Sequence, residues 1–308
     1  MGERGVYHEG ELAVQELAGE RELAERHAAG IGASVMRGAW SWLERQQLLA
    51  LATGTAGGPV WASVWFGAPG FVESRDDGQT LWIRRAELAA LQVDPVLQRL
   101  APGAAVGALA IELQTRRRLR INGRVRALDD EALVLEVGEA FANCPKYIAK
   151  RELSAGAGAA TQAAPARGVE LDEARRATIG RSDTLFVGSL HPERGADASH
   201  RGGEPGFVQV VDARTLRIPD YAGNGMYQTL GNLHSSGRAG IVFLDFEGRR
   251  LLHVTGTTSL SFAEEQLVTG GTRRSWDLRV ENWLEGALPV GVTGALVERS
   301  RFNPSAGE

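Results

Sequence analysis

The segment "SHRGGEPGFV", residues 199–208, places a histidine and an arginine directly before two glycines and a proline–glycine turn. An arginine guanidinium can hold two oxygens of a phosphate, and adjacent glycines let successive backbone N–H groups point at one anion. A histidine beside them adds a further donor. The residues that we expect to form an anion-binding loop are Ser199, His200, Arg201, Gly202 and Gly203. The competing interpretation is a solvated polar loop that ends in a turn.

Two later segments place polar residues at the end of a predicted strand and on a predicted short helix. "IPDYAGN", residues 218–224, leaves a strand through a proline, and its turn-forming residues can hold polar groups at the strand end. "MYQTLGNL", residues 226–233, is typical of a short helix with leucines in the core. The residues that we expect to contact a ligand from these segments are Ile218, Pro219, Asp220, Asn224, Gln228 and Asn232. Alternatively, they serve only as turn and cap residues.

A third segment, "NCPKYI", residues 143–148, closes the first half of the chain. Pro145 restricts Cys144 to an extended conformation, and we expect Lys146 and Tyr147 to reach across to a ligand in the second half. The alternative is a domain-closing turn around a buried thiol. No histidine or acid is visibly paired with Cys144, so we predict no nucleophile there and assign no catalytic residue.

Metal-binding patterns and common nucleotide loops are weak or missing. His8, Glu9 and Glu11 stand close together in "HEGE", but they lack the HExxH spacing of a zinc site, and we interpret them as solvated helix charge. The single cysteine excludes an internal disulfide and a cysteine-cluster metal site. No Walker loop, strand-linked GxGxxG or GxSxG elbow is present. We therefore predict no metal site.

Composition limits the classes of partner. The chain has 308 residues, 43% of them hydrophobic, and its 34 Lys+Arg against 38 Asp+Glu give a net charge of -4. This balance does not favour nucleic acid as a partner, and no apolar run is long enough to span a bilayer. The charged N-terminus lacks the apolar region of a secretory signal, and one cysteine fits a reducing compartment. We expect a cytoplasmic protein without nucleic-acid or membrane partners.

The elements that must position these residues are mostly strands. We expect an amphipathic helix over Glu9–Ala29, weakened at Gly19, and a short helix near residues 38–47. Short apolar or alternating runs from Leu48 onward predict consecutive strands. We expect further helices at residues 86–100, 129–141, 170–181 and around 224–237, a polar loop at 191–206, and an Ala/Gly-rich mobile linker or surface loop at 154–168.

The two halves of the chain repeat three short motifs in the same order. "PGFVES" matches "PGFVQV", "TLWI" matches "TLRI", and "LRING" matches "LHVTG", at separations of 136, 135 and 133 residues. This order predicts two domains of one fold, each with antiparallel strands and one helix in the middle. Barrel closure would remove exposed strand edges, and the groove between two such barrels is a natural ligand site. The expected boundaries are 1–47 for an N-terminal helical segment, 48–153, 154–180 for a linker and short helix, and 181–308.

Basic residues cluster on one predicted hairpin in each half. Arg116–Arg118 and Arg120 lie on the first, and Arg249, Arg250 and His253 lie on the second. A solvated face is the simpler account. The alternative is that the two hairpins flank a groove that attracts anionic substrates.

Residues 184–260 resemble the pyridoxamine 5'-phosphate oxidase-like, FMN-binding split-barrel family. The likeness lies in the order strand, tight turn, strand, short helix with "LGNL", strand, hairpin and strand ending in "TG". "SHRGG", "PDYAGN" and "NCPKYI" resemble a branch described only as FMN-binding. The resemblance implies a mainly β (α+β) fold of two tandem split β-barrels with an N-terminal helix. Unlike the oxidases proper, this chain has Gln209 near the lysine position and no Arg or Lys in "YAGNGMY", so its phosphate site must be built differently.

The resemblance also implies a function. We expect an FMN-dependent oxidoreductase that transfers a hydride or electrons to an unidentified small molecule. FMN would bind mainly to the second half, with the first half as one wall. NAD(P)H or a flavin reductase would supply the electrons, and the chain would form a homodimer. The alternatives are a non-catalytic flavin- or haem-binding module and a deazaflavin-dependent reductase.

Overall fold

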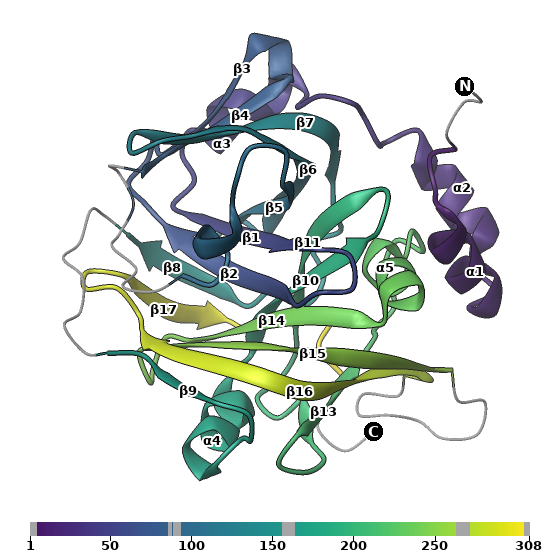
Figure 1. Ribbon diagram of the computed structural model, residues 1–308, viewed down its shortest axis with the longest axis vertical. Helices are drawn as coiled ribbons and strands as arrows, with labels where there is room; N and C mark the ends of the chain where they lie inside the picture. The colour runs from purple at the N-terminus through teal and green to yellow at the C-terminus, as the bar shows by residue number, and fades with distance from the viewer. Residues whose placement is uncertain (1–4, 86–87, 89–93, 156–163, 263–271, 305–308) are drawn as a thin grey trace.

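The computed structural model describes residues 5–85, 88, 94–155, 164–262 and 272–304 of the chain. These residues form two large antiparallel sheets and a small two-stranded sheet, with short helices at the periphery (Figure 1). The predicted mainly β fold is confirmed. Among the described residues, no helix has both the length and the apolar character needed to cross a membrane.

The first large sheet is built from the first half of the chain. Its strands pair in the order β2-β1-β5-β6-β7-β4-β3, and every pair is antiparallel. The strands are β1 (Leu48–Gly54), β2 (Val60–Phe66), β3 (Val72–Arg75), β4 (Thr80–Arg84), β5 (Ala105–Glu112), β6 (Arg117–Leu128) and β7 (Ala132–Ala142).

The second large sheet is built from the second half. Its main path runs β11-β10-β14-β15-β16-β13-β12, and β9 (Ala166–Gly168) pairs with β16. The strands are β10 (Thr184–His191), β11 (Gly195–Gly202), β12 (Gln209–Val210), β13 (Thr215–Pro219), β14 (Arg238–Asp245), β15 (Arg250–Phe262) and β16 (Arg274–Ala287). The small sheet pairs β8 (Lys150–Ser154) with β17 (Thr293–Glu298), one strand from each half.

The two large sheets follow one plan. When strands are numbered from one within each half, both sheets read 2-1-5-6-7-4-3, so the repeat predicted from the three motifs is confirmed by strand order. The matched motifs lead into or lie on equivalent strands. The register also shifts at the equivalent glycines, Gly123 in β6 and Gly256 in β15, where a Cβ atom would collide with Glu136 O or Arg279 O. Within the described residues neither sheet closes through its end strands, so two split barrels remain a prediction.

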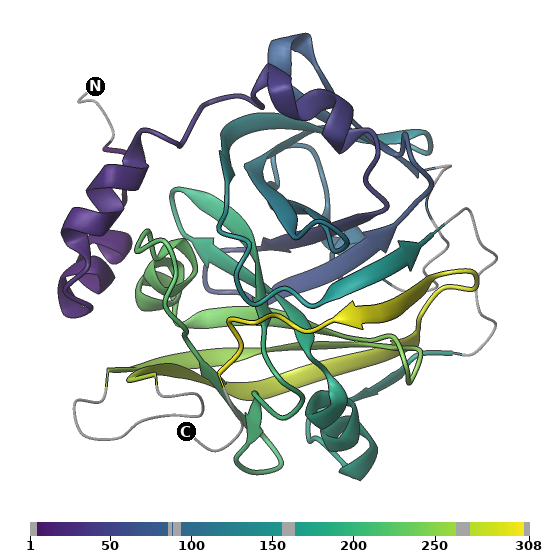
Figure 2. The same ribbon diagram turned by 180° about the vertical axis from the view of Figure 1, so that it is seen from behind.

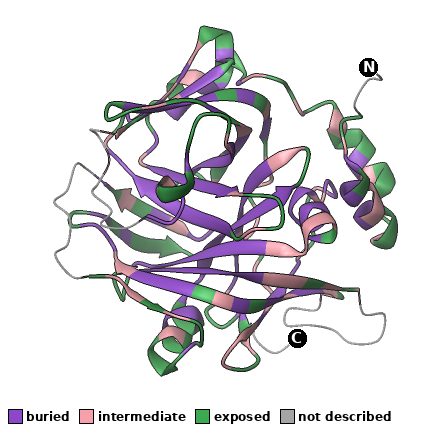
Figure 3. Cartoon of the chain, viewed as in Figure 1, coloured by how far each residue is buried: buried purple, intermediate pink, exposed green. Residues whose placement is uncertain are grey.

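The halves pack face to face around a shared core. Strand β2 lies against β14 and β15, and β11 lies against β5 and β6 in the same way. Gly107 and Gly240 occupy equivalent close approaches, since a Cβ on either would lie 2.5 Å from backbone of the other half. One apolar cluster joins the halves, including Leu48, Val64 and Phe186. Buried residues accordingly run through the middle of both sheets (Figure 3).

In the described part of the chain, five α-helices lie around the sheets. They are α1 (Glu9–Leu17), α2 (Arg21–Ala28), α3 (Trp40–Leu43), α4 (Glu173–Arg181) and α5 (Gln228–Ser236). The single helix predicted over Glu9–Ala29 is two helices, because Gly19 adopts φ +66° between them. The helices predicted near 38–47, 170–181 and 224–237 correspond to α3, α4 and α5. Both views place α1 and α2 beside α5 at one edge (Figures 1 and 2).

Two predictions from local sequence are wrong. Residues 129–141 were expected to be helical, but 132–142 form β7, whose buried Val and Leu side chains suit a strand packed in the core. Residues 191–206 were expected to be a loop, but 195–202 form β11, which pairs with β10 along its whole length. The described part of the predicted linker includes β9, and its residues 156–163 lie outside the described residues. Residues 86–87 and 89–93 of the helix predicted at 86–100 also lie outside them.

Candidate functional site

A small pocket of about 90 Å³ lies where the two halves meet. The first half contributes the start of β6 and residues 143–147. The second half contributes the end of β11, the end of β13 and the segment that leads into α5. We call it the arginine pocket, after Arg118, Arg120 and Arg201 in its walls.

Two of these arginines have carboxylate partners. Arg120 is buried and forms an ion pair with Asp197 at 3.1 Å, and it donates to Gln228 Oε1 at 3.3 Å. Arg201 lies 3.5 Å from Asp220. Because Arg118 and Arg120 are two residues apart on β6, their side chains leave the same face of the strand. The pocket therefore gathers positive charge from both halves.

Arg118 has no such partner. Its Nε donates to Cys144 O at 2.8 Å, and no ion pair of the described residues involves it. Burial, and then the neighbouring charges of Arg120 and Arg201, lower the pKa of Arg118 to about 9. A bound anion would relieve both effects, because it would return to the guanidinium the stabilisation that water no longer gives.

The tautomer of His200 follows from its neighbour. Arg118 Nη1 lies 3.4 Å from His200 Nδ1, and a guanidinium can only donate, so Nδ1 accepts and Nε2 carries the proton. His200 is 2% exposed, and burial together with Arg118 and Arg201 lowers its pKa well below the ordinary value, which keeps the ring neutral. Within the described structure Nε2 has no partner. The pocket thus contains an unused N–H donor.

Further buried polar atoms here also lack partners. A buried polar atom without a hydrogen bond costs about 1–3 kcal/mol, so such atoms are rare and need an explanation. A polar ligand between these side chains would satisfy them together. Among the described residues, the unpartnered atoms on pocket-lining residues are Arg120 Nε, Asn143 Oδ1, His200 Nε2, Arg201 Nε, Tyr227 OH and Gln228 Nε2.

Aromatic rings form another part of the wall. The Tyr147 and Tyr221 ring centroids are 5.1 Å apart, and Tyr147 OH donates to Ala222 O at 3.0 Å across the two halves. Tyr147 adopts φ +65°, which brings its backbone against β11. Gly202 permits this approach, since a Cβ there would collide with Tyr147 O. Lys146 and Tyr147 therefore do line a pocket shared with the second half.

Nine of the predicted ligand contacts line the pocket, and four lie elsewhere. Ser199 is buried and accepts a hydrogen bond from Thr229. Gly203 N donates to Asp183 O, so the glycine pair packs closely and does not present two free N–H groups. Ile218 is in the core, and Asn232 contacts His8 and Ser189. The lining residues are Lys146, Tyr147, His200, Arg201, Gly202, Pro219, Asp220, Asn224 and Gln228.

Sequence reasoning did not place Arg118, Arg120, Asn143 and Tyr227 at the site. The sequence places both arginines on a predicted basic hairpin, for which a solvated face is the simpler interpretation. Their signal was the alternation of basic and apolar residues in "RRLRI", residues 117–121, which is typical of a strand with one charged face. Only the packing of β11 against β6 shows that this face is covered.

A second groove of about 440 Å³ lies between Trp61 and Trp283. Its arginines, Arg99 and Arg167, are exposed to water. Among its described lining residues, only Trp61 Nε1 is a buried polar side-chain atom without a partner. The groove is larger than the arginine pocket, but fewer of its buried polar atoms lack a hydrogen-bond partner.

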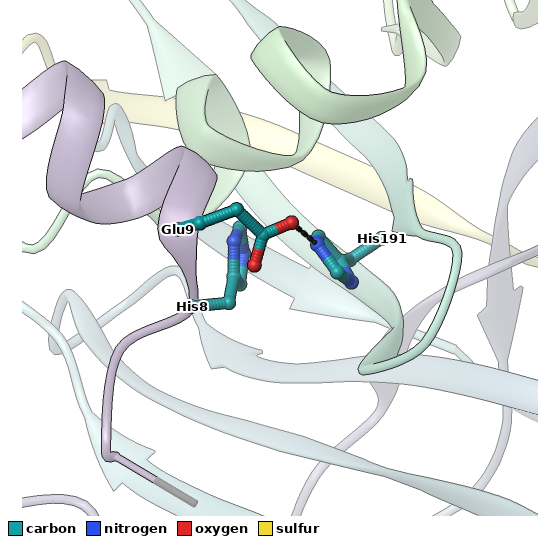
Figure 4. A group of neighbouring side chains, drawn as sticks. All are labelled: His8, Glu9 and His191. Atoms are coloured by element: carbon teal, nitrogen blue, oxygen red, sulfur yellow. Dashed lines mark hydrogen bonds and ion pairs between the residues drawn. The ribbon is translucent and has the colours of Figure 1, made fainter.

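His8, Glu9 and His191 form a cluster of residue types that can hold a metal (Figure 4). Both histidines accept backbone N–H groups at Nδ1, His8 from residues 10 and 11 and His191 from residues 193 and 194. Their Nε2 atoms therefore carry protons, which point to Asn232 Oδ1 at 3.0 Å and to Glu9 Oε1 at 2.8 Å. A metal would have to displace both protons and break the cap of α1. The expectation of solvated helix charge is wrong for His8 and Glu11, which are buried, and we interpret the cluster as the anchor of that helix.

No protein-family model and no curated protein matches this chain. Among the solved structures that align with part of it are three with low TM-scores. Two are of HupZ from Group A Streptococcus, at 15% identity, over 38% and 40% of this chain and 99% and 98% of HupZ, with TM-scores of 0.31 and 0.30. The third, from Lactobacillus delbrueckii, is provisionally named a pyridoxamine 5'-phosphate oxidase, at 12% identity over 38% of this chain and 94% of that one, with a TM-score of 0.31. Likenesses at these TM-scores carry no argument about fold or function.

Proposed function

We propose that the arginine pocket binds the phosphate end of FMN and that the chain is an FMN-dependent oxidoreductase built from two split barrels. One observation carries the proposal: six buried polar atoms without partners belong to residues that line one pocket, together with three guanidiniums from both halves. The resemblance of "SHRGG", "PDYAGN" and "NCPKYI" to FMN-binding proteins supports FMN over other phosphorylated ligands.

The charge of the pocket fits a phosphate. A phosphate monoester carries close to two negative charges and accepts several hydrogen bonds. Arg118 lacks an acidic partner among the described residues, and His200 Nε2 is a free donor beside it. Arg120 and Arg201 already balance Asp197 and Asp220, so they add donors more than net charge.

The size of the pocket restricts where the flavin ring can lie. A volume of about 90 Å³ is below the range of about 300–1,000 Å³ for typical ligand pockets. The enclosed part suits a phosphate, and the ring would lie toward Tyr147 and Tyr221 or require the wall at 219–230 to move outward. When bound, FMN supplies hydride or electron transfer. The chain would hold its phosphate, orient its ring against the tyrosines and exclude water from one side.

The test is an absorption spectrum of the purified protein, mass identification of any released compound, and titration of the apoprotein with FMN. We expect a flavin spectrum or uptake of one FMN per chain. Colourless protein that does not take up FMN would contradict the proposal. A deazaflavin that displaces FMN, or a haem spectrum, would favour those alternatives. Bound FMN without turnover of NAD(P)H and a panel of acceptors would indicate a non-catalytic module.

Arg118→Gln is the sharpest variant for the same test. It removes the one pocket arginine without an acidic partner among the described residues, and we expect the FMN dissociation constant to rise about 10- to 100-fold. The matched control is Arg250→Gln on the equivalent hairpin, because Arg250 is exposed and outside the lining of the pocket. Equal affinities in the two variants would remove Arg118 from the site.

A further inference from the structure

Helices α1 and α2 lie against the segment that forms one wall of the arginine pocket (Figures 1 and 2). Gln15 Nε2 donates to Met226 O at 3.2 Å. At the junction between α1 and α2, Arg274 forms ion pairs with Glu20 at 3.0 Å and with Asp220 at 3.3 Å. Residues 219–230 of the pocket wall are therefore held from behind by the N-terminal helices.

The contact between α1 and α5 is as close as two backbones allow. A Cβ on Gly10 would collide with Gly231 O and Ser235 Oγ, and a Cβ on Gly231 would lie 2.6 Å from Glu11 N. His8 adds the hydrogen bond to Asn232 one turn away. Since α5 begins with Gln228, which lines the pocket, a shift of α1 would move residues of the pocket wall.

Glu11 is the acidic group at the centre of this contact. It is 5% exposed, and its carboxylate accepts from His8 N at 2.8 Å in a capping box. Burial, followed by the nearby acids Glu139 and Asp197, raises the pKa of Glu11 to about 8. The charged and titratable groups around it are Tyr7 and the N-cap His8 just before α1, Glu139 on β7, Arg194 in the β10–β11 turn and Asp197 on β11.

The acids behind α1 connect directly to the pocket. Asn122 Nδ2 donates to Asp197 Oδ1 at 3.2 Å and lies 3.5 Å from Glu139 Oε2. The same Asp197 holds Arg120 at 3.1 Å. An added negative charge on Glu11 would therefore repel Glu139 and Asp197, the acids that lie behind α1. Asp197 is also the partner of the pocket residue Arg120.

We propose that α1 and α2 form a brace that positions the wall of the arginine pocket, and that α1 stays packed against α5 while Glu11 holds a proton. Glu11, Gly10 and Gly231 are then positioning residues, which touch no ligand. Loss of the proton puts a third carboxylate beside Glu139 and Asp197, loosens α1 and lowers affinity in the pocket. FMN affinity should therefore fall as pH rises through the pKa of Glu11. The inference rests on the proposed function for its ligand only.

The test uses the full chain and FMN at about pH 6.5 and about pH 9.5, on either side of the titration. We expect the dissociation constant to rise about tenfold more in the wild type than in Glu11→Gln, because the amide keeps the cap without the charge. Any loss of the Arg118 proton, whose pKa is about 9, is common to both proteins. A Glu11→Gln variant with the full wild-type rise would overturn the role of the proton.

Gly10→Ala tests the brace itself. We expect about tenfold weaker FMN binding already at about pH 6.5, since the added methyl group pushes α1 off α5. The matched control is Gly180→Ala, where a helical Cβ meets nothing within 4 Å, and we expect it to bind as the wild type does. Equal binding by the two variants would overturn the brace.

A ligand-free measurement separates this inference from the proposed function. Amide hydrogen exchange over residues 223–233 should be faster in Gly10→Ala than in Gly180→Ala without any FMN. If FMN never binds but this difference is seen, the function is wrong and the brace stands. Unchanged exchange over this segment in Gly10→Ala would contradict the brace even if FMN binds.

Discussion

The arginine pocket has a counterpart at the equivalent position of the other half, and the two differ in nearly every side chain. Equivalent residues are found by following the strand ladders outward from the repeated motifs "LRING" and "LHVTG". In each half the ladder crosses four adjacent strands to the edge strand. The matching series are Leu119, Ala110, Leu49 and Trp65 in the first sheet and Leu252, Phe243, Leu185 and Arg201 in the second.

By this correspondence the polar residues of the pocket are replaced by core residues. Arg118 corresponds to Leu251, and His200 corresponds to Val64, both of which are buried in the shared apolar cluster. Trp65, the residue equivalent to Arg201, donates a hydrogen bond from Nε1 to the buried Asp94 at 2.9 Å. One copy of the fold thus packs this position for stability. The other leaves guanidiniums and an imidazole partly unsatisfied, which is expected where binding is needed more than packing.

The residues that lie behind the two equivalent positions differ as well. Asp197 and Glu139, which α1 covers, correspond to Trp61 and Asn282 of the second groove. The helix that we propose as a brace lies on the side where the acids are. The duplicated sheets therefore supply one geometry, and the two positions differ in their side chains and in the presence of the N-terminal helices.

The largest expected effect comes from forcing the charge of the pocket into its counterpart. Leu251→Arg would bury a guanidinium in the apolar cluster without an acid to meet it, and we expect the free energy of unfolding to fall by about 4 kcal/mol or more. Urea denaturation measures it. The control is Arg250→Leu, one residue away and exposed, which should change stability by about 0.5 kcal/mol or less. A tolerated Leu251→Arg would mean that the counterpart is not a packed core.

The reverse exchange should separate binding from stability. Arg118→Leu copies the residue of the counterpart, and we expect FMN affinity to fall about 100-fold while the apoprotein becomes more stable by about 1 kcal/mol, because a half-buried charge without an acidic partner among the described residues is removed. FMN titration and urea denaturation of the same samples measure the two effects. Loss of both affinity and stability would show that Arg118 holds the fold together and is not reserved for a ligand.

A smaller effect distinguishes the buried histidines of the two positions. Burial lowers the pKa of both His200 and His253, so the unfolded chain binds more protons, and stability should fall as pH drops below about 6.5. His200→Gln and His253→Gln should each reduce this slope in urea denaturation. Excess FMN should reduce the contribution of His200 only, because a phosphate favours its charged form. A ligand effect on the contribution of His253 would contradict the comparison.

The repeat was predictable, and the pocket was only partly so. The motifs at Pro69 and Pro205 revealed the plan because turn residues and apolar strands leave local patterns. β11 was missed because "GADASHRG" is polar and glycine-rich, and it is buried only because the other half packs on it. His200 and Arg201 were found from residue type, whereas Arg118 needed the contact between β6 and β11, which no local pattern encodes.

The most direct test of the central claim is a crystal structure of the full chain with FMN. We predict that the phosphate oxygens lie within about 3 Å of the Arg118 guanidinium and of His200 Nε2, with the ring near Tyr147 and Tyr221. A phosphate bound elsewhere, with Arg118 and His200 unchanged and still unpartnered, would contradict the account.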